Sequence, residues 1–208
     1  MAGGHSSRLG RDKSAELVDG LSLVGRVVNR LEPLSTKILL VISQRQLYSS
    51  FLSHTEYVKT RIVTDIYPEM GPLGGIYTGL IYSTSHVNLT VACDMPFLKC
   101  DLLRHMIDLS SGFDAVVPRI GNLREPLHAV YTKGCLPTIE KMLNEDNRRV
   151  MDLLDSVKVR YVDKDEIERF DSAHLSFFNI NTQADLERAW IFSERERDFD
   201  SVVAEKKG

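Results

Sequence analysis

The chain opens on a glycine-rich, basic run that sets the expected fold: residues 2–13 read Ala2-Gly3-Gly4-His5-Ser6-Ser7-Arg8-Leu9-Gly10-Arg11-Asp12-Lys13. Two adjacent glycines let bare backbone N–H groups approach a phosphate closely, and Arg8 and Lys13 add fixed positive charge nearby. The run has neither the Gly-Lys-Ser/Thr ending of a Walker loop nor the Gly-x-Gly-x-x-Gly spacing of dinucleotide-binding folds. It therefore predicts another kind of phosphate-binding turn, one suited to a nucleoside triphosphate.

Outward from this run, short β-branched segments alternate with longer amphipathic segments. This pattern is typical of an α/β fold with a mostly parallel sheet and helices on both faces. The expected strands are residues 37–43, 61–65, 88–93, 115–118, 129–132, 159–162 and 176–180. The expected helices are residues 22–34, 73–83, 101–109, 136–144, 150–155 and 184–192. Residues 115–118 and 129–132 are too close for a helix between them, which predicts an antiparallel pair, a turn near Gly121-Asn122 and a mixed sheet.

The composition is that of one globular domain over residues 1–208, with 43% hydrophobic and 26% charged side chains. Residues 193–208 are rich in charge and are expected to form a solvated helix or tail. A net charge of −3 argues against a broad nucleic-acid-binding face. The apolar runs are too short to cross a bilayer. Three cysteines without a CxxC pair predict a reducing, cytoplasmic setting.

Motifs along the chain carry a resemblance to a known family. The glycine-rich run, with Gly3-Gly4 near its start and Asp12-Lys13 at its end, resembles the signature of the molybdenum cofactor guanylyltransferases. Further segments are similar to later motifs of that family, in their usual order: Asp65 with Gly71-Pro72-Leu73-Gly74-Gly75, Ala92-Cys93-Asp94-Met95-Pro96, Glu125-Pro126-Leu127-His128-Ala129-Val130-Tyr131, Arg148-Arg149-Val150-Met151 and Phe178-Asn179-Ile180-Asn181-Thr182. The resemblance extends to about Leu186.

The resemblance implies a three-layer, Rossmann-like nucleotidyltransferase fold. Members of the family have a buried apolar strand directly ahead of the glycine loop. Met1 stands where that strand would end, so we expect the first strand to be missing or truncated.

The resemblance also implies an activity, the transfer of GMP from GTP to the phosphate of Mo-molybdopterin with release of pyrophosphate, and Mg²⁺ as the cofactor. Three alternatives stay open: a cytidylyltransferase for the same pterin, a nucleotidyltransferase for another phosphate acceptor, and a non-catalytic relative that binds the cofactor. The expected partners are GTP and Mo-molybdopterin, with transient contacts to molybdopterin-synthesis proteins or acceptor molybdoenzymes. Neither nucleic acid nor a membrane is expected.

Asp94 follows the apolar residues 89–93 directly, so it should emerge at the carboxyl end of a strand, where open α/β sheets bind their ligands. By the resemblance it binds Mg²⁺ and contacts the nucleotide, and a hard carboxylate oxygen suits that ion. A helix cap is the alternative role for this carboxylate. Pro96 delays the next helix, however, and Asp101 is the better cap for it.

Other expected site residues lie in several segments. Catalytic roles fall to Lys13, Arg8 and Asp94, and nucleotide contacts to Met1, Ala2, Gly3, Gly4, Lys13, Asp65, Gly75 and Asp94. Lys13 with Arg8 should neutralise charge on the leaving pyrophosphate. Asp65 ends an apolar run where the family has an aspartate that contacts the nucleotide, and a strand-end turn is its alternative role.

The acceptor side of the site is expected to include two asparagines and two arginines. Asn179 and Asn181 flank Ile180 on an expected strand, so their amides should point to one side, toward the metal's water shell or the pterin phosphate. Arg148 and Arg149 resemble the family's paired arginines and would bind the pterin phosphate. A surface pair at a helix start is the alternative for these arginines.

Overall fold

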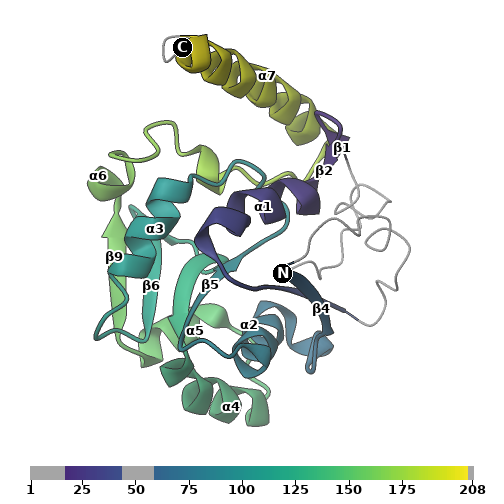
Figure 1. Ribbon diagram of the computed structural model, residues 1–208. Coiled ribbons are helices and arrows are strands. Elements are labelled where there is room, and N and C mark those ends of the chain that lie inside the picture. The colour runs from purple at the N-terminus through teal and green to yellow at the C-terminus, as the bar shows by residue number, and fades with distance from the viewer. Residues whose placement is uncertain (1–16, 44–58, 206–208) are drawn as a thin grey trace.

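Two groups of strands form the framework of the structure (Figure 1). The computed structural model describes residues 17–43 and 59–205, with side chains as far as residue 194. Its strands are β1 (Leu17–Val18), β2 (Leu21–Ser22), β3 (Ile38–Ile42), β4 (Thr60–Thr64), β5 (Val87–Val91), β6 (Ala115–Ile120), β7 (Leu123–Arg124), β8 (His128–Thr132) and β9 (Val159–Asp163). Its helices are α1 (Leu23–Leu31), α2 (Gly71–Tyr82), α3 (Cys100–Asp108), α4 (Leu136–Asn144), α5 (Val150–Ser156), α6 (Lys164–Ile167) and α7 (Gln183–Glu205).

The larger group of strands is a five-stranded mixed sheet. It runs in the order β5, β8, β6 and β7, with β9 also paired to β6. β8 is antiparallel to both β5 and β6, whereas β9 is parallel to β6. The predicted antiparallel pair is therefore confirmed as β6 and β8, and Gly121 takes a positive φ of 59° at the predicted turn. β3 and β4 form a separate parallel pair.

Helices cover both faces of the strands (Figure 1). α1 and α3 lie on one face, where Val27 and Leu103 pack in one cluster with Val91 of β5. α2, α4 and α5 lie on the opposite face and share a second cluster with β6 and β8. The predicted arrangement of helices on both faces of the sheet is confirmed. Within residues 17–43 and 59–205, no helix combines the length and the apolar character that a membrane span requires.

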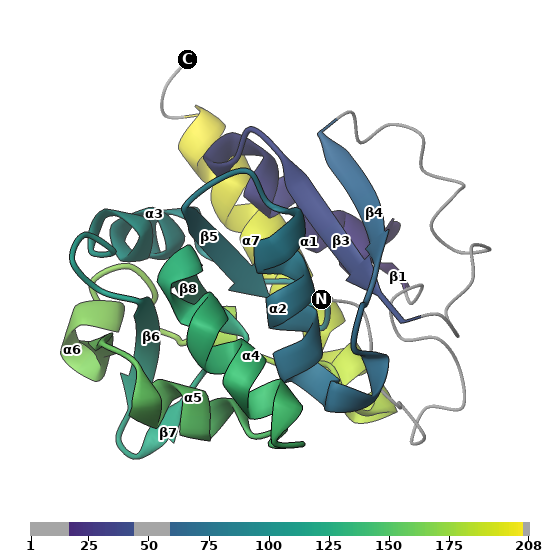
Figure 2. The ribbon, with the colours of Figure 1, turned by 90° about the horizontal axis from the view of Figure 1, so that it is seen from below.

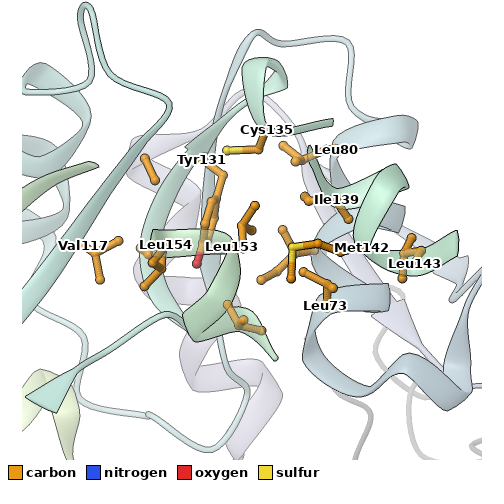
Figure 3. Close-up of a cluster of buried hydrophobic side chains, with 14 residues drawn as sticks. Leu73, Leu80, Val117, Tyr131, Cys135, Ile139, Met142, Leu143, Leu153 and Leu154 are labelled. Carbon is orange, nitrogen blue, oxygen red and sulfur yellow. The ribbon is translucent and has the colours of Figure 1, made fainter. Parts of the chain in front are cut away.

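The cluster beneath β6 and β8 is the largest apolar core in the described residues (Figure 3). Tyr131 of β8 is fully buried there, and its hydroxyl donates to the Pro126 carbonyl at 2.9 Å. Leu73 and Leu80 of α2 meet Ile139 of α4 in the same cluster. Burial of each such aliphatic side chain stabilises the fold by roughly 1.5–3 kcal/mol. This core fixes α2 against the five-stranded sheet.

The first helix begins as the sequence predicts. The Ser22 side chain accepts a hydrogen bond from the Gly25 amide at 3.1 Å, which caps α1. Pro33 lies in a 3-10 turn, Glu32–Leu34, that ends the helical segment. The cap and this terminating turn together confirm the expected helix over residues 22–34.

Two expectations about local structure are wrong. Residues 176–180 do not form a strand, because the buried carboxylate of Asp171 binds the Leu175 and Ser176 amides at 3.0 and 2.7 Å and holds a 3-10 turn there. Asp101 does not cap α3. The Ser176 hydroxyl binds the Lys99 amide at 3.0 Å, which places Lys99 at the cap and Asp101 in the first turn.

Further elements were not expected from the sequence. β1 and β2 form a hairpin across Asp19 and Gly20, which both have positive φ. β7 and α6 are also additional. The charged carboxyl-terminal segment is helical, since α7 extends to Glu205 and projects from the body of the molecule (Figure 1). The question of a missing first strand concerns a part of the chain that lies outside the described residues.

Candidate active site

Asp94 lies where three segments meet at the carboxyl end of β5. The Ile180 amide donates to the Asp94 carbonyl at 3.0 Å, and this bond joins the segment after the Leu175–Phe177 turn to the end of β5. The Ala92 amide donates to the Leu127 carbonyl at 2.9 Å, and this bond joins the segment before β8. The predicted placement of Asp94 at a strand end is therefore confirmed. α3 begins only at Cys100, so Asp94 is not its cap.

Glu125 is a second carboxylate beside Asp94. Burial raises the pKa of Glu125, and the negative charge of Asp94 raises that pKa further. Two carboxylates that repel each other in a partly buried place are a suitable pair of hard oxygen donors for a divalent cation. The donor set thus fits Mg²⁺, which takes one or two carboxylates and keeps its remaining ligands as water and substrate phosphate.

His128 is a buried, neutral residue that packs beside the end of β5. It pairs across the ladder with Val91 of β5, and its ring lies 4.9 Å from the Phe177 ring. Complete burial lowers the pKa of His128 to about 3, so the imidazole is neutral at physiological pH. His128 therefore packs the turn that leads to Ile180 against the start of β8.

Asp65 directly follows β4, and its carboxylate accepts two hydrogen bonds from nearby protein groups. Its Oδ1 accepts hydrogen bonds from the Tyr67 amide at 3.0 Å and from the Thr78 hydroxyl of α2 at 2.8 Å. The alternative role of a strand-end turn is thus present in the structure. Among the described residues Oδ2 takes no hydrogen bond, so a nucleotide contact through that atom stays a prediction.

The glycines that begin α2 let the helix approach its neighbours closely. Gly71 has φ 58° and ψ −142°, a conformation open to glycine, and Pro72 starts the helix as predicted. A Cβ at Gly74 would lie 2.2 Å from the Tyr67 carbonyl oxygen. Gly75 is buried and lines a cavity between β3 and β5. The close approach shown at Gly74 is to backbone, and the nucleotide contact expected of Gly75 stays a prediction.

Asn179 and Asn181 flank the residue that is bonded to Asp94. The strand expected there is absent, but the Ile180 amide still places this segment at the site. The Asn179 side-chain amide donates to the Phe177 carbonyl at 3.5 Å. Capping of α7 falls to Thr182, which exchanges hydrogen bonds with Asp185 at 2.9 and 3.2 Å. The asparagines are thus not needed as caps.

The β1–β2 hairpin, which follows the glycine-rich run in the sequence, lies near the same corner. Val18 is fully buried in a cluster with Phe97 and Ile180, close to the end of β5. The Trp190 indole donates to the Leu17 carbonyl at 3.2 Å and ties the hairpin to α7. The chain after residue 16 therefore starts beside the segments that carry Asp94.

Comparisons with known proteins identify the family. A model of the MobA-like NTP transferase domain matches residues 1–160. The chain belongs to this family. The expected resemblance and the nucleotidyltransferase fold are confirmed, and the chain is a nucleotidyltransferase.

Relatives and solved structures agree with this assignment. A probable molybdenum cofactor guanylyltransferase of Pelotomaculum thermopropionicum is 33% identical over 197 residues, covering 95% of this chain and 93% of the relative. The molybdenum cofactor guanylyltransferase of Syntrophotalea carbinolica is 32% identical over 90% of this chain and 87% of its own length. Molybdopterin-guanine dinucleotide biosynthesis protein A of Archaeoglobus fulgidus has a TM-score of 0.78 at 27% identity, covering 93% of this chain and 96% of that chain.

The remaining predicted residues of this MobA-like domain are placed elsewhere or are not described. Arg148 pairs with Asp146 at 3.0 Å, and Arg149 pairs with Asp152 at 3.5 Å, both at the start of α5. These bonds match the alternative of a helix-start surface pair, and the pterin contact stays a prediction. The expected phosphate-binding residues Met1, Ala2, Gly3, Gly4, Arg8 and Lys13 lie outside the described residues.

Proposed function

We propose that the protein transfers GMP from GTP to the terminal phosphate of molybdenum-bound molybdopterin, which yields the guanine dinucleotide form of the cofactor and pyrophosphate. The observation that carries this proposal is the similarity, at 33% and 32% identity over most of both chains, to relatives named molybdenum cofactor guanylyltransferase. The position of Asp94 at the end of β5 supports it, because open α/β sheets bind their ligands at that edge. Transient contact with acceptor molybdoenzymes is part of the proposal.

The reaction is an in-line exchange at phosphorus. An oxygen of the acceptor phosphate attacks the α-phosphorus of GTP, and the bond from that phosphorus to the bridging oxygen breaks as pyrophosphate leaves. A phosphate monoester is largely ionised at neutral pH, so the nucleophile needs no strong general base. Catalysis can then depend on alignment and on neutralisation of charge.

The residues divide these tasks among them. Asp94 and Glu125 would hold Mg²⁺, and when bound the ion would supply positive charge to the phosphates. Lys13 and Arg8 would stabilise the leaving pyrophosphate. Asn179 and Asn181 would orient the acceptor phosphate from the segment bonded to Asp94.

Substitution of Asp94 tests the proposed catalytic centre. We expect Asp94→Asn to lower kcat/KM for pyrophosphate release by about 100-fold or more while the protein stays folded, because the amide removes the negative charge that would hold the ion. Asp101→Asn is the matched control, since Asp101 is exposed in α3 and pairs only locally with Arg104 among the described residues. Equal activity of the two variants in saturating Mg²⁺ would remove Asp94 from the reaction.

Competition among nucleotides tests the donor. Purified protein with Mo-molybdopterin and Mg²⁺ should convert GTP in preference to CTP, ATP and UTP, with the dinucleotide product identified by mass. Preference for CTP would contradict the proposed base. Turnover of GTP onto a phosphosugar, but not onto the pterin, would contradict the proposed acceptor.

A further inference from the structure

Residues 175–182 form the segment that carries the two asparagines of the proposed acceptor side. The segment lies between α6 and α7, and Figure 2 shows α6 at one side of the molecule, apart from α7. Asn179 is half-buried and Asn181 is exposed, and both flank Ile180. Apart from the short turn Leu175–Phe177, the segment has no regular secondary structure, so other contacts must hold the two side chains in place.

A buried carboxylate holds the start of this segment. Asp171 is only 3% exposed, and its two carboxylate oxygens accept hydrogen bonds from the Leu175 amide at 3.0 Å and the Ser176 amide at 2.7 Å. Burial of a negative charge costs free energy unless hydrogen bonds stabilise the charge. The bonds that offset this cost also fix the geometry of the turn.

The turn is joined in its own right to the segment that follows β5. Ser176 is fully buried, and its hydroxyl accepts a hydrogen bond from the Lys99 amide at 3.0 Å. Four residues later, the Ile180 amide donates to the Asp94 carbonyl at 3.0 Å. The carboxylate of Asp171 therefore fixes a turn that leads directly to the two asparagines and to Asp94.

The far end of the segment is held by a second carboxylate with another task. The Asp185 carboxylate accepts hydrogen bonds from the Asn181 and Thr182 amides at 3.1 and 2.9 Å. It belongs to the cap of α7, so the helix itself accounts for its position. Asp171 caps none of the α-helices within residues 17–43 and 59–205. Its carboxylate instead holds the turn ahead of the asparagines.

We propose that Asp171 is a positioning residue for the acceptor side of the site. Through the turn Leu175–Phe177, its carboxylate holds the side chains of Asn179 and Asn181 where they meet the acceptor phosphate beside Asp94. The inference rests on the proposed function, which supplies that phosphate. Asp171 acts from behind the asparagines, so its loss should weaken binding of the pterin and leave binding of GTP intact.

The substitution Asp171→Asn tests this role. Asparagine has nearly the same shape, but it offers one acceptor oxygen, and its NH₂ group would face the second amide of the turn. We expect KM for Mo-molybdopterin to rise about tenfold and KM for GTP to change by less than about twofold. A general loss of folded protein would lower turnover and leave both KM values unchanged.

Asp114→Asn is the matched control. The Asp114 carboxylate also accepts a backbone amide, that of Lys158 at 2.9 Å. β5 and β6 are parallel, since both are antiparallel to β8, so Asp114 at the start of β6 lies at the sheet edge opposite to Asp94. Asp114→Asn should lower the free energy of unfolding and change neither KM by more than about twofold. An equal rise of the pterin KM in both variants would overturn the proposal.

A further substitution tests whether Asp171 acts through the asparagines. In a variant with Asn179→Ala and Asn181→Ala, adding Asp171→Asn should change the pterin KM by less than about twofold, because the groups that it positions are gone. A further rise of about tenfold in this background would show that Asp171 acts by another route, which contradicts the proposal.

Ser176→Ala carries the test where Asp171→Asn fails to fold. It removes only the hydroxyl that binds the Lys99 amide, and it should raise the pterin KM about threefold with KM for GTP unchanged. An unchanged pterin KM in this folded variant would overturn the proposal.

The wild type shows which of the two proposals has failed. Transfer of GMP to the pterin by the wild type, with the same pterin KM in Asp171→Asn, would overturn this inference and leave the proposed function in place. A wild type that does not react with the pterin would overturn both, because the asparagines would then have no acceptor phosphate to hold.

Discussion

β5 and β8 are neighbours in one sheet, yet they are buried to very different degrees. All five residues of β8 are buried, whereas four of the five residues of β5 are half-buried. β8 is no more apolar in sequence, since it contains His128 and Thr132. It lies between β5 and β6, whereas β5 borders the cavity between β3 and β5. The comparison shows that, among the described residues, a strand with sheet neighbours on both sides is buried more deeply than a strand that borders the cavity, although the two are similar in apolar composition.

The largest expected effect comes from truncating one side chain on each side of this comparison. Ile139 is fully buried in the core beneath β8, so Ile139→Ala should lower the free energy of unfolding by about 2–5 kcal/mol. Leu89 of β5 is half-buried and borders the cavity between β3 and β5, so Leu89→Ala should lower the free energy of unfolding by about 1 kcal/mol. Urea unfolding measures both values. Equal losses of unfolding free energy in the two variants would contradict the difference in burial between β8 and β5.

Two glycines of α2 sharpen the comparison within one helix. Gly74→Ala should cost about 1–3 kcal/mol, because its Cβ would lie 2.2 Å from a backbone carbonyl oxygen. Gly79→Ala should be neutral or stabilise by up to about 1 kcal/mol, because its Cβ would make an ordinary contact and alanine favours helix. Thermal unfolding of the two variants separates the tightly packed start of α2 from the part that borders the cavity between β3 and β5. A destabilised Gly79→Ala variant would contradict the space that the structure shows beside Gly79.

The burial of His128 on β8 predicts a pH dependence of stability. Its pKa is lowered to about 3 in the fold, against about 6.5 in the unfolded chain, so only the unfolded chain takes up a proton as pH falls through 6.5. Stability should therefore decrease by about 1–2 kcal/mol between pH 7 and pH 5. His128→Leu should remove this slope in urea unfolding, whereas His86→Leu at an exposed position should keep it. A slope that survives in His128→Leu would exclude this origin.

The smallest expected effect concerns Glu125 and Mg²⁺. Because its pKa is raised in the fold, Glu125 lowers stability as pH rises from its unfolded pKa through its folded pKa, and Glu125→Gln should be more stable than the wild type at neutral pH. Mg²⁺ should raise Tm of the wild type by about 2–4 °C, corresponding to about 1 kcal/mol for a chain of this size. The Mg²⁺ effect should be smaller in Glu125→Gln and should disappear with a chelator. An unchanged Mg²⁺ effect in Glu125→Gln would exclude this carboxylate from the ion.

Much of the fold can be predicted from local sequence signals. The apolar run before Asp94 correctly predicts β5. The helix predicted from Ser22 agrees with α1, which Ser22 caps. The hairpin of β1 and β2 was missed although Asp19-Gly20 is a strong turn signal, because its strands are too short to show a periodic pattern. The strand predicted over residues 176–180 was wrong because a side-chain contact decides the local structure: the carboxylate of Asp171, four and five residues earlier, accepts hydrogen bonds from the Leu175 and Ser176 amides and holds a turn there.

The site residues also include one that the sequence predicts and one that it does not. Asp94 could be predicted because its role follows from its place after one strand. Glu125 was quoted in a motif but was given no role, because its proximity to Asp94 depends on the antiparallel pairing of β5 with β8. Long-range pairing of this kind leaves no local trace in the sequence. A search for carboxylates just before a strand predicted to pair with β5 would have found Glu125.

The most direct test of the proposed site is a crystal structure of the protein with GTP and Mg²⁺. The account predicts the triphosphate at the carboxyl end of β5, with the ion bound by the carboxylate of Asp94 and the glycine-rich run around the phosphates. A triphosphate bound away from Asp94, with no ion at that carboxylate, would contradict it.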